Sequence, residues 1–326
     1  MSVAFQANNL TIGYQVGNQQ KTVAGPLNFK LNKGELICIM GANGIGKSTL
    51  LRTIAGLQKP ISGKVEINQN DIHLSSNQER AKLLSIVLTT KPNFNLLTVR
   101  QLVELGRYPY TNWRHILSSN DQLAVNNAIS AVGLEHDSEK QIAELSDGNM
   151  QKAMIARALA QETELILLDE PTIHLDLKNK LMVLHLLAKL SKQYKKSILI
   201  ASHDLNMMIQ LADKLWLFQK DKLVMGTPED LMYNGAVDEI IGSEKFELSL
   251  NEIKMRSSFE TVWVQGDSEL KYWLERALLR NGYSISKDSP IKLVVNKTVI
   301  ELIIGNHKQP YQSIEETLIA LENTNL

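Results

Sequence analysis

Short continuous apolar runs recur along the chain and indicate strands buried on both faces of a sheet. They occur in ELICIM, ELILL and SILIA, at residues 35–40, 164–168 and 197–201. Such runs are typical of parallel strands that helices cover on both sides. The segment STLLRTIAGL, at residues 48–57, instead places apolar residues at helical spacing. Strands that alternate with helices in this way predict an α/β fold with a parallel sheet.

Two other parts of residues 1–248, which we expect to form one domain, have different patterns. The first 35 or so residues, and SGKVEINQNDI at 62–72, have the pattern of short strands and turns. They predict an antiparallel β-subdomain. Residues from about 92 to 160 contain helical patterns such as TVRQLVELGRY and NDQLAVNNAISAVGL. They predict a helical subdomain.

Residues 249–326 are predicted to form a small C-terminal α+β domain with the element order β-α-β-β-α. TVWVQG is a candidate strand, and IKLVVN and TVIELII have the pattern of a hairpin. Asp267 and Gly282 are expected to bound a helix between them, and a capping box from Ser313 to Glu316 starts a last helix. No catalytic constellation stands out here, so a dimerising or stabilising role and a regulatory role both stay open.

Composition excludes some classes of protein. Lysine plus arginine, 35 residues, equals aspartate plus glutamate, 35 residues, which disfavours a nucleic-acid partner. The one cysteine, Cys38, lies in an apolar run, so we expect a buried thiol, no intrachain disulfide and a reducing compartment. The chain begins without a signal-peptide pattern and has no run of about 18 apolar residues. If the protein works at a membrane, another chain must supply the membrane part.

A glycine-rich loop follows the first buried strand. It reads GANGIGKS, residues 41–48, and matches G-x-x-x-x-G-K-[ST]. A strand–loop–helix of this kind directs backbone N–H groups at a phosphate, where the helix dipole favours anions. We expect Lys47 to reach the outer phosphates and the Ser48 hydroxyl to hold Mg²⁺. A glycine-rich turn that matches by chance is the alternative. The candidate nucleotide-binding residues are Gly41, Ala42, Asn43, Gly44, Ile45, Gly46, Lys47, Ser48 and Thr49.

An acidic pair follows the second buried strand. In ELILLDEPT, Asp169 lies at the carboxyl end of the strand, where open α/β sheets bind ligands. We expect Asp169 to support Mg²⁺ and Glu170 to point toward the terminal phosphate and orient a water. The alternative is a strand followed by a plain acidic turn. The phosphate loop upstream favours the functional interpretation.

Four further segments resemble parts of one family, in that family's order. ELSDGNMQKAMIARALAQ, residues 144–161, resembles the ABC signature and its helix, and IHLD, ending at Asp176, resembles the D-loop. SILIASHD contains His203, which resembles the switch histidine, and LTIGY presents Tyr14, which resembles the aromatic A-loop. Residues 1 to about 240 thus resemble an ABC-type ATP-binding subunit, which implies a P-loop NTPase cassette fold.

The resemblance implies a catalytic set of Lys47, Glu170 and His203. His203 would contact the γ-phosphate and hold the attacking water with Glu170, the candidate base, because phosphoryl transfer depends on positioning and charge stabilisation. Tyr14 has the flat ring that stacks on adenine, although an ordinary strand aromatic is the alternative.

The resemblance also implies a homodimer of cassettes, with two ATP molecules between two head-to-tail copies. In the family the signature meets the nucleotide of the partner copy, so Ser146 and Gly148 would offer a hydroxyl and a backbone N–H to its γ-phosphate. Asp176, in the D-loop segment, joins the candidate nucleotide-binding residues. A helix cap at Ser146 without any ligand is the alternative.

One stretch narrows the class of transporter. TVRQLVELGRYPYTNW, residues 98–113, resembles importers of iron-siderophores, haem or cobalamin. This implies a cytoplasmic ATPase subunit, peripheral on the inner face of the membrane. Its partners would be an integral membrane permease dimer and, indirectly, a separate substrate-binding protein. The alternative is a soluble ABC ATPase of the iron–sulfur assembly type, while the signature and His203 argue against a P-loop kinase.

The chain departs from the family at one position. ABC cassettes usually carry a glutamine after the strand in SIVLTT, and here that position is Thr89. A threonine hydroxyl can bond a metal-bound water, although its side chain is shorter. We therefore predict that Thr89 lies near the Mg²⁺ and acts through a water. The alternative is a plain loop threonine without a sensing role.

Overall fold

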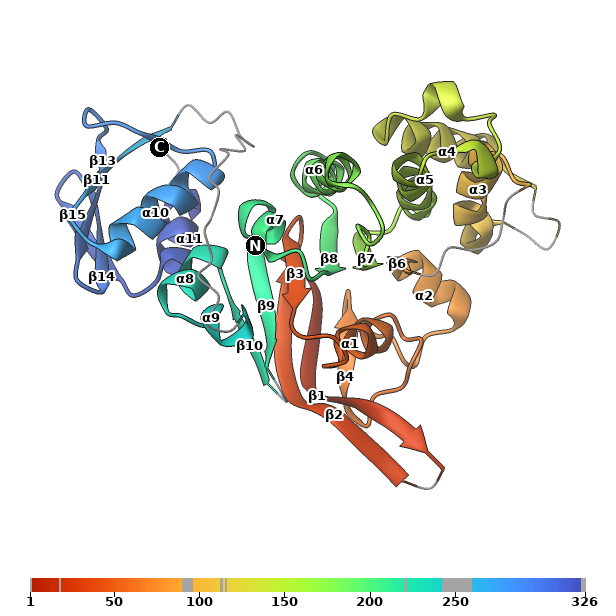
Figure 1. The fold of residues 1–326 in the computed structure, drawn as a ribbon, viewed down its shortest axis with the longest axis horizontal. Helices are drawn as coiled ribbons and strands as arrows, with labels where there is room; N and C mark the ends of the chain where they lie inside the picture. The colour runs from red at the N-terminus through yellow and green to blue at the C-terminus, as the bar shows by residue number, and fades with distance from the viewer. Residues whose placement is uncertain are drawn as a thin grey trace. The chain divides into compact units, whose positions relative to one another are not determined.

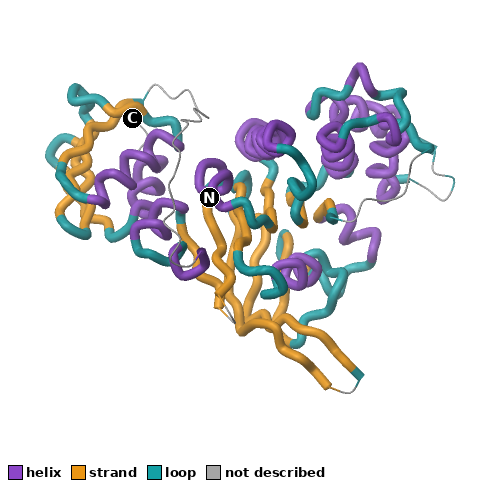
Figure 2. Tube along the Cα trace, in the orientation of Figure 1, coloured by secondary structure: helices purple, strands orange, loops and turns teal. Residues whose placement is uncertain are grey.

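The computed structural model of this chain divides into two compact units. The first unit contains Met1–Met207 and Phe218–Leu223, and the second contains Met208–Leu217 and Val224–Leu326. Each unit is described by itself below (Figures 1 and 2). The residues that the structure describes are 2–17, 19–89, 96–111, 114, 116–219, 222–241 and 260–323.

An antiparallel sheet opens the first unit, as predicted. Strand β1 (Val3–Val16) pairs with both β2 (Gln19–Asn32) and β4 (Ser62–Ile67), and the sheet order is β2-β1-β4-β5, with β5 at Asn70–Asp71. Its buried side chains include Phe5, which packs edge-on against Phe29.

The core of the first unit is a parallel sheet built from the apolar runs. Its strands here follow the order β3-β8-β7-β6 and all pair in parallel. Every residue of β3, β7 and β8 is buried, including Cys38, which confirms the expectation for that thiol. Parallel pairing brings the carboxyl ends of these strands to one edge. The bounds are β3 Leu36–Met40, β6 Leu84–Val87, β7 Leu165–Asp169 and β8 Ser197–Ala201.

Some helices of this unit contact the sheet, and those between residues 99 and 160 belong to the predicted helical part. Helix α1 (Lys47–Ile54) follows β3, and α6 (Leu177–Tyr194) follows the loop after β7. The predicted start of the helical subdomain, residue 92, lies outside the described residues. The other helices of this unit are α2 Asn77–Leu83, α3 Val99–Glu104, η1 Leu105–Tyr110, α4 Ser119–Ala131, η2 Glu135–Asp137, η3 Ile142–Glu144 and α5 Asp147–Ala160.

A buried arginine joins the helical part together. The Arg107 side chain, from the GRYP stretch, lies 2.8 Å from the Asp121 carboxylate through Nε and 2.7 Å from that of Glu162 through Nη1. Its Nη1 also donates to the Ala160 carbonyl at 2.6 Å, and its guanidinium lies over the Tyr110 ring. The pKa of Asp121 is lowered, mainly by the hydrogen bond from the Ser118 hydroxyl and further by Arg107.

The second unit contains the C-terminal domain, a five-stranded sheet of order β12-β11-β13-β14-β15. Alternate side chains on one sheet face pack against α10 and α11, which lie on that face in Figure 1. The described elements follow the predicted β-α-β-β-α order, with two short strands, β12 and β15, added. Their bounds are β11 Thr261–Gln265, α10 Glu269–Arg280, β12 Ser284–Ile285, β13 Ile291–Asn296, β14 Val299–Ile304, β15 His307–Tyr311 and α11 Ile314–Asn323.

The caps of this domain differ in detail from the prediction. Ser268, and not Asp267, is the N-cap of α10, because its hydroxyl accepts from the Lys271 backbone N–H. At α11 the Ser313 hydroxyl accepts from the Glu316 N–H as predicted, but the Glu316 carboxylate accepts from Gln312. The predicted boundary between residues 248 and 249 falls outside the described residues and stays a prediction.

The rest of the second unit comes from the chain before that domain. It includes parts of α7 (Leu205–Leu211), β9 (Lys214–Gln219) and β10 (Lys222–Gly226), followed by α8 (Pro228–Tyr233) and α9 (Asp238–Ile241). No helix in the described ranges is long and apolar enough to span a bilayer.

The first turn of α8 holds the C-terminal domain. Both carboxylate oxygens of Glu229 lie 2.8 Å from the guanidinium of Arg280 on α10, and the Glu229 side chain is 0% exposed. Arg280 also donates to the carbonyl of Ala212, at 2.9 Å. The neighbouring Asp230 carboxylate accepts from the first two backbone N–H groups of α11, Ile314 and Glu315, at 2.8 Å each. Burial nevertheless raises the pKa of Asp230.

Candidate nucleotide site

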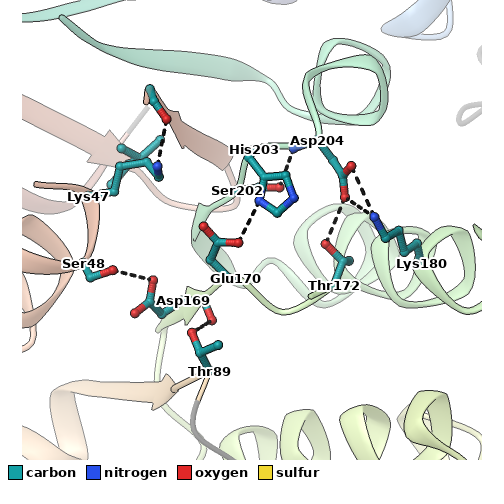
Figure 3. Close-up of polar contacts among 12 residues, drawn as sticks. Lys47, Ser48, Thr89, Asp169, Glu170, Thr172, Lys180, Ser202, His203 and Asp204 are labelled. Atoms are coloured by element: carbon teal, nitrogen blue, oxygen red, sulfur yellow. Dashed lines mark hydrogen bonds and ion pairs between the residues drawn. The ribbon is translucent and has the colours of Figure 1, made fainter. Parts of the chain in front are cut away.

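The glycine-rich loop joins β3 to α1 at the carboxyl edge of the parallel sheet. Gly44 and Gly46 have φ values of +78° and +123°, which residues with a Cβ rarely adopt, so the loop needs glycine there. The Lys47 Nζ donates to the carbonyls of Gly41 at 2.8 Å and Ala42 at 3.1 Å, and Lys47 is buried. The Lys47 side chain therefore stabilises the loop that is expected to bind the phosphates. Figure 3 shows Lys47 and one of these two hydrogen bonds.

A hydroxyl and a carboxylate converge beside this loop. The Ser48 Oγ donates to the Asp169 Oδ1 at 3.2 Å, and burial raises the pKa of Asp169. No cluster of three or more acidic, histidine or cysteine side chains that could hold a metal ion occurs among the described residues. The pair nevertheless fits Mg²⁺, which proteins usually bind through one or two oxygen side chains while substrate phosphates and waters complete the shell.

Glu170 and His203 meet at the ends of neighbouring strands. The Glu170 Oε2 lies 2.8 Å from the His203 Nδ1, and the imidazole is about half exposed while the carboxylate is mostly covered (Figure 3). Glu170 has a positive φ of +52°, and its N–H donates to the Ala201 carbonyl at 2.9 Å. The structure thus brings the predicted base and the predicted switch histidine into direct contact.

A third acidic side chain, Asp204, is not among the residues predicted from the sequence and stabilises the loop after β8. The Asp204 carboxylate lies 3.0 Å from the Lys180 Nζ on α6 and accepts from the Thr172 hydroxyl at 3.4 Å. Its own N–H donates to the Ser202 hydroxyl at 3.1 Å. In the sequence, Asp204 stood out only because it follows His203 in the segment SHD. No motif includes Lys180.

Thr89 lies beside the acidic pair but makes a different contact from the one predicted. Its hydroxyl donates to the backbone carbonyl of Asp169 at 2.8 Å (Figure 3). Because that bond uses the only hydroxyl proton, a water could meet Thr89 only as a donor to the hydroxyl oxygen. The predicted contact through a metal-bound water stays a prediction.

Tyr14 presents an exposed ring next to the phosphate-loop helix. The residue is 44% exposed, although the preceding residues of the strand, Ile12 and Gly13, are buried. Its hydroxyl is hydrogen-bonded to the hydroxyl of Thr49 on α1. The ring is thus tethered at its polar end, and the exposed residue is expected to stack on a planar base.

The signature and D-loop residues form a second group around Asn179 on α6. Ser146 is the N-cap of α5, and Asp176 is the N-cap of α6, whose side chain accepts from the Asn179 N–H at 2.8 Å. A Cβ on Gly148 would lie 2.4 Å from the Asn179 Oδ1, so a larger residue at position 148 would require the Asn179 side chain to move. In the single chain the Asp176 carboxylate therefore serves as a helix cap. Its expected contact with a nucleotide stays a prediction.

Two family models match the chain. The model of the ABC transporter family matches residues 24–173, and the model of the iron ABC transporter C-terminal domain matches residues 259–322. The second match covers the sheet and helices of the C-terminal domain.

Curated relatives match most of this chain over most of their own length. An uncharacterised ABC transporter ATP-binding protein of Methanocaldococcus jannaschii is 38% identical over 264 residues, which are 78% of this chain and 90% of the relative. The achromobactin transport ATP-binding protein of Dickeya dadantii is 38% identical over 73% of this chain and 87% of its own. The ferric enterobactin transport ATP-binding protein of Escherichia coli is 34% identical over 73% and 86%.

Solved structures give the same fold. One describes an inward-facing conformation of a metal-chelate type ABC transporter, with a TM-score of 0.64 and 31% identity over 74% of this chain and 89% of that chain. Another is a dimeric ATP-binding cassette bound to ADP and Pi, with a TM-score of 0.59 and 27% identity over 69% of this chain and 98% of that chain.

Proposed function

Because this chain belongs to the ABC transporter family of ATP-binding proteins, we propose that it drives import of a metal chelate through a separate membrane permease. Relatives that act in achromobactin and ferric enterobactin transport support an iron-siderophore as the cargo. Haem and cobalamin are further cargoes of the proposed class. The structural observation that supports ATP as the energy source is the convergence of Lys47, Asp169 and Glu170 at one edge of the sheet.

The protein hydrolyses ATP, and we infer one step for each side chain of the site. The loop before α1 binds the phosphates, with Lys47 as the cation nearest to them. Glu170 orients the attacking water, and His203, hydrogen-bonded to it, contacts the terminal phosphate. Ser48 and Asp169 would hold Mg²⁺, which neutralises charge on the phosphates when bound.

We propose that the working state is a homodimer of cassettes. Ser146 and Gly148 lie at the N-terminus of α5, where backbone N–H groups and the helix dipole favour a phosphate. The similarity to a dimeric cassette that holds ADP and Pi supports the proposal that this phosphate belongs to a nucleotide bound by the partner copy. The dimer would be isologous, with the same patches on both copies.

The remaining partners follow from the proposed class. They are an integral membrane permease dimer and, indirectly, a separate substrate-binding protein, which would place this chain in the cytoplasm on the inner face of the membrane. We expect no nucleic-acid partner for this chain. The iron–sulfur assembly alternative gains nothing from the relatives reported above, whose names refer to transport.

Uptake by cells tests this function. A strain that lacks the gene would receive either the wild-type chain or Glu170→Gln, and import of radioactive iron would be measured with siderophore, haem and, separately, labelled cobalamin. We expect wild-type alone to restore uptake of one of these cargoes and the chain to co-purify with a permease in detergent. An active ATPase that restores none of them and retains no membrane partner would contradict the proposal.

A further inference from the structure

The peptide group between Asp169 and Glu170 is the point from which the candidate base is aimed. Glu170 adopts φ +52°, a left-handed conformation that is unfavourable for a residue with a Cβ. A residue persists there only if its surroundings hold it. The direction of the Glu170 side chain therefore depends on what holds this one peptide group.

Both polar ends of that peptide group are anchored, from the two neighbouring strands of the sheet. On the β8 side, the Glu170 N–H donates to the Ala201 carbonyl at 2.9 Å. On the β6 side, the Asp169 carbonyl accepts from the Thr89 hydroxyl at 2.8 Å. Because β7 lies between β8 and β6, the two bonds pull on the peptide plane from opposite sides.

The hydrogen bond from Thr89 lies just beyond the point where the backbone pairing of β6 with β7 ends. The last paired residues of β6 and β7 are Val87 and Leu168, whereas β7 and β8 still pair at Asp169 and Ala201. The Asp169 carbonyl would thus face the β6 side beyond the end of the ladder, where the Thr89 side chain meets it. A hydroxyl on Cβ reaches this carbonyl, and valine, with the same shape, could not donate to it.

We propose that Thr89 is a positioning residue for Glu170, which it controls through the Asp169–Glu170 peptide group. Rotation of that peptide would turn the Glu170 carboxylate away from His203, which lies 2.8 Å from it. A small misplacement of a group that orients a water can lower turnover strongly without changing nucleotide affinity. The inference rests on the role proposed for Glu170, and it gives Thr89 a task that needs neither the metal nor the permease.

The test compares Thr89→Val, which removes the donor, with Thr89→Ser, which keeps it, in the full-length purified chain. We expect Thr89→Val to lower kcat for ATP about tenfold with little change in KM, and Thr89→Ser to retain most of the activity. ATP affinity and the thermal midpoint, measured on the same samples, show whether each variant is folded. Thr111→Val is the matched control, because the Thr111 hydroxyl also donates to a backbone carbonyl, that of Tyr108 at 3.2 Å in the helical part.

A second comparison separates this inference from the role of Glu170. If Thr89 acts through Glu170, Thr89→Val should add no loss to the residual single-turnover rate of Glu170→Gln. Full activity of Thr89→Val, equal losses in the Val and Ser variants, or an independent loss in the Glu170→Gln background would each overturn the inference. Near-normal turnover of Glu170→Gln alone would instead remove the proposed base, and the inference with it.

Discussion

At the scale of single residues, Arg107 has a structural explanation that its sequence context did not suggest. The GRYP stretch resembles a segment typical of metal-chelate importers, yet this side chain is 5% exposed and bound to two carboxylates and a carbonyl. Removing one partner of a buried ion pair is costly because the other charge stays in a poor environment. Arg107 therefore contributes to the stability of the helical part.

We expect Arg107→Met to lower the free energy of unfolding by about 3 kcal/mol, because it leaves Asp121 buried without its cation. Urea unfolding of the purified chain measures this. Adding Asp121→Asn to Arg107→Met should recover part of the loss, since the uncompensated charge is then gone. A change below about 1 kcal/mol in the single variant would contradict the structural role.

Glu170→Gln is expected to bind ATP normally and to lose hydrolysis, because the amide keeps the size of the side chain but cannot act as a base. The loss should be at least about a hundredfold in kcat. Phosphate release and fluorescent nucleotide binding, measured side by side, separate the two effects. Substantial hydrolysis with unchanged affinity would take the catalytic role away from this residue.

At the scale of elements, the sequence was most informative where a pattern is local. Three apolar runs predicted three buried strands, and the phosphate loop and acidic pair were placed correctly at their ends. The α10 cap was wrong by one residue, because Asp267 and Ser268 are both good caps and only the bond to Lys271 distinguishes them. Contacts between distant segments, such as those of Thr89 and Asp204, depend on the folded sheet and leave no periodic signal.

The salt bridge between α8 and α10 gives a prediction at this scale. Arg280→Met leaves Glu229 buried and unpaired, so we expect a loss of about 3 kcal/mol in stability. Glu229→Gln in the same chain should restore part of it, and thermal unfolding measures both. ATP affinity should stay the same, because every predicted nucleotide-binding residue lies in the first unit. A parallel fall in affinity would show that α8 and α10 also support the site.

At the scale of the whole molecule, the proposed dimer makes each ATP site a product of two chains. If the Lys47 of one copy and the Ser146 of the other share a nucleotide, two different defective copies can complement each other. One mixed dimer site would carry both changes and the other would carry neither. If instead both residues served the same nucleotide within one chain, no intact site could form.

We therefore expect a mixture of Lys47→Ala and Ser146→Arg chains to recover ATP occlusion that neither variant has alone. Both chains would also carry Glu170→Gln, so that captured ATP is retained and can be counted after gel filtration. In an equal mixture with random pairing, half of the dimers are mixed and each of these has one intact site of two. Occlusion at about a quarter of the level of Glu170→Gln alone is therefore the expected result. Absence of recovery, with both variants folded, would contradict the shared site.

The acids on α8 also limit how the C-terminal domain could be transplanted. Glu229 and Asp230 precede residue 259, where the match to the C-terminal domain family begins, yet they bind Arg280 and the start of α11. A graft cut at that homology boundary would carry an arginine without its counter-charge and a helix without its cap. The segment that has to be transferred is thus longer than the one that matches the family model, and it has to include the first turn of α8.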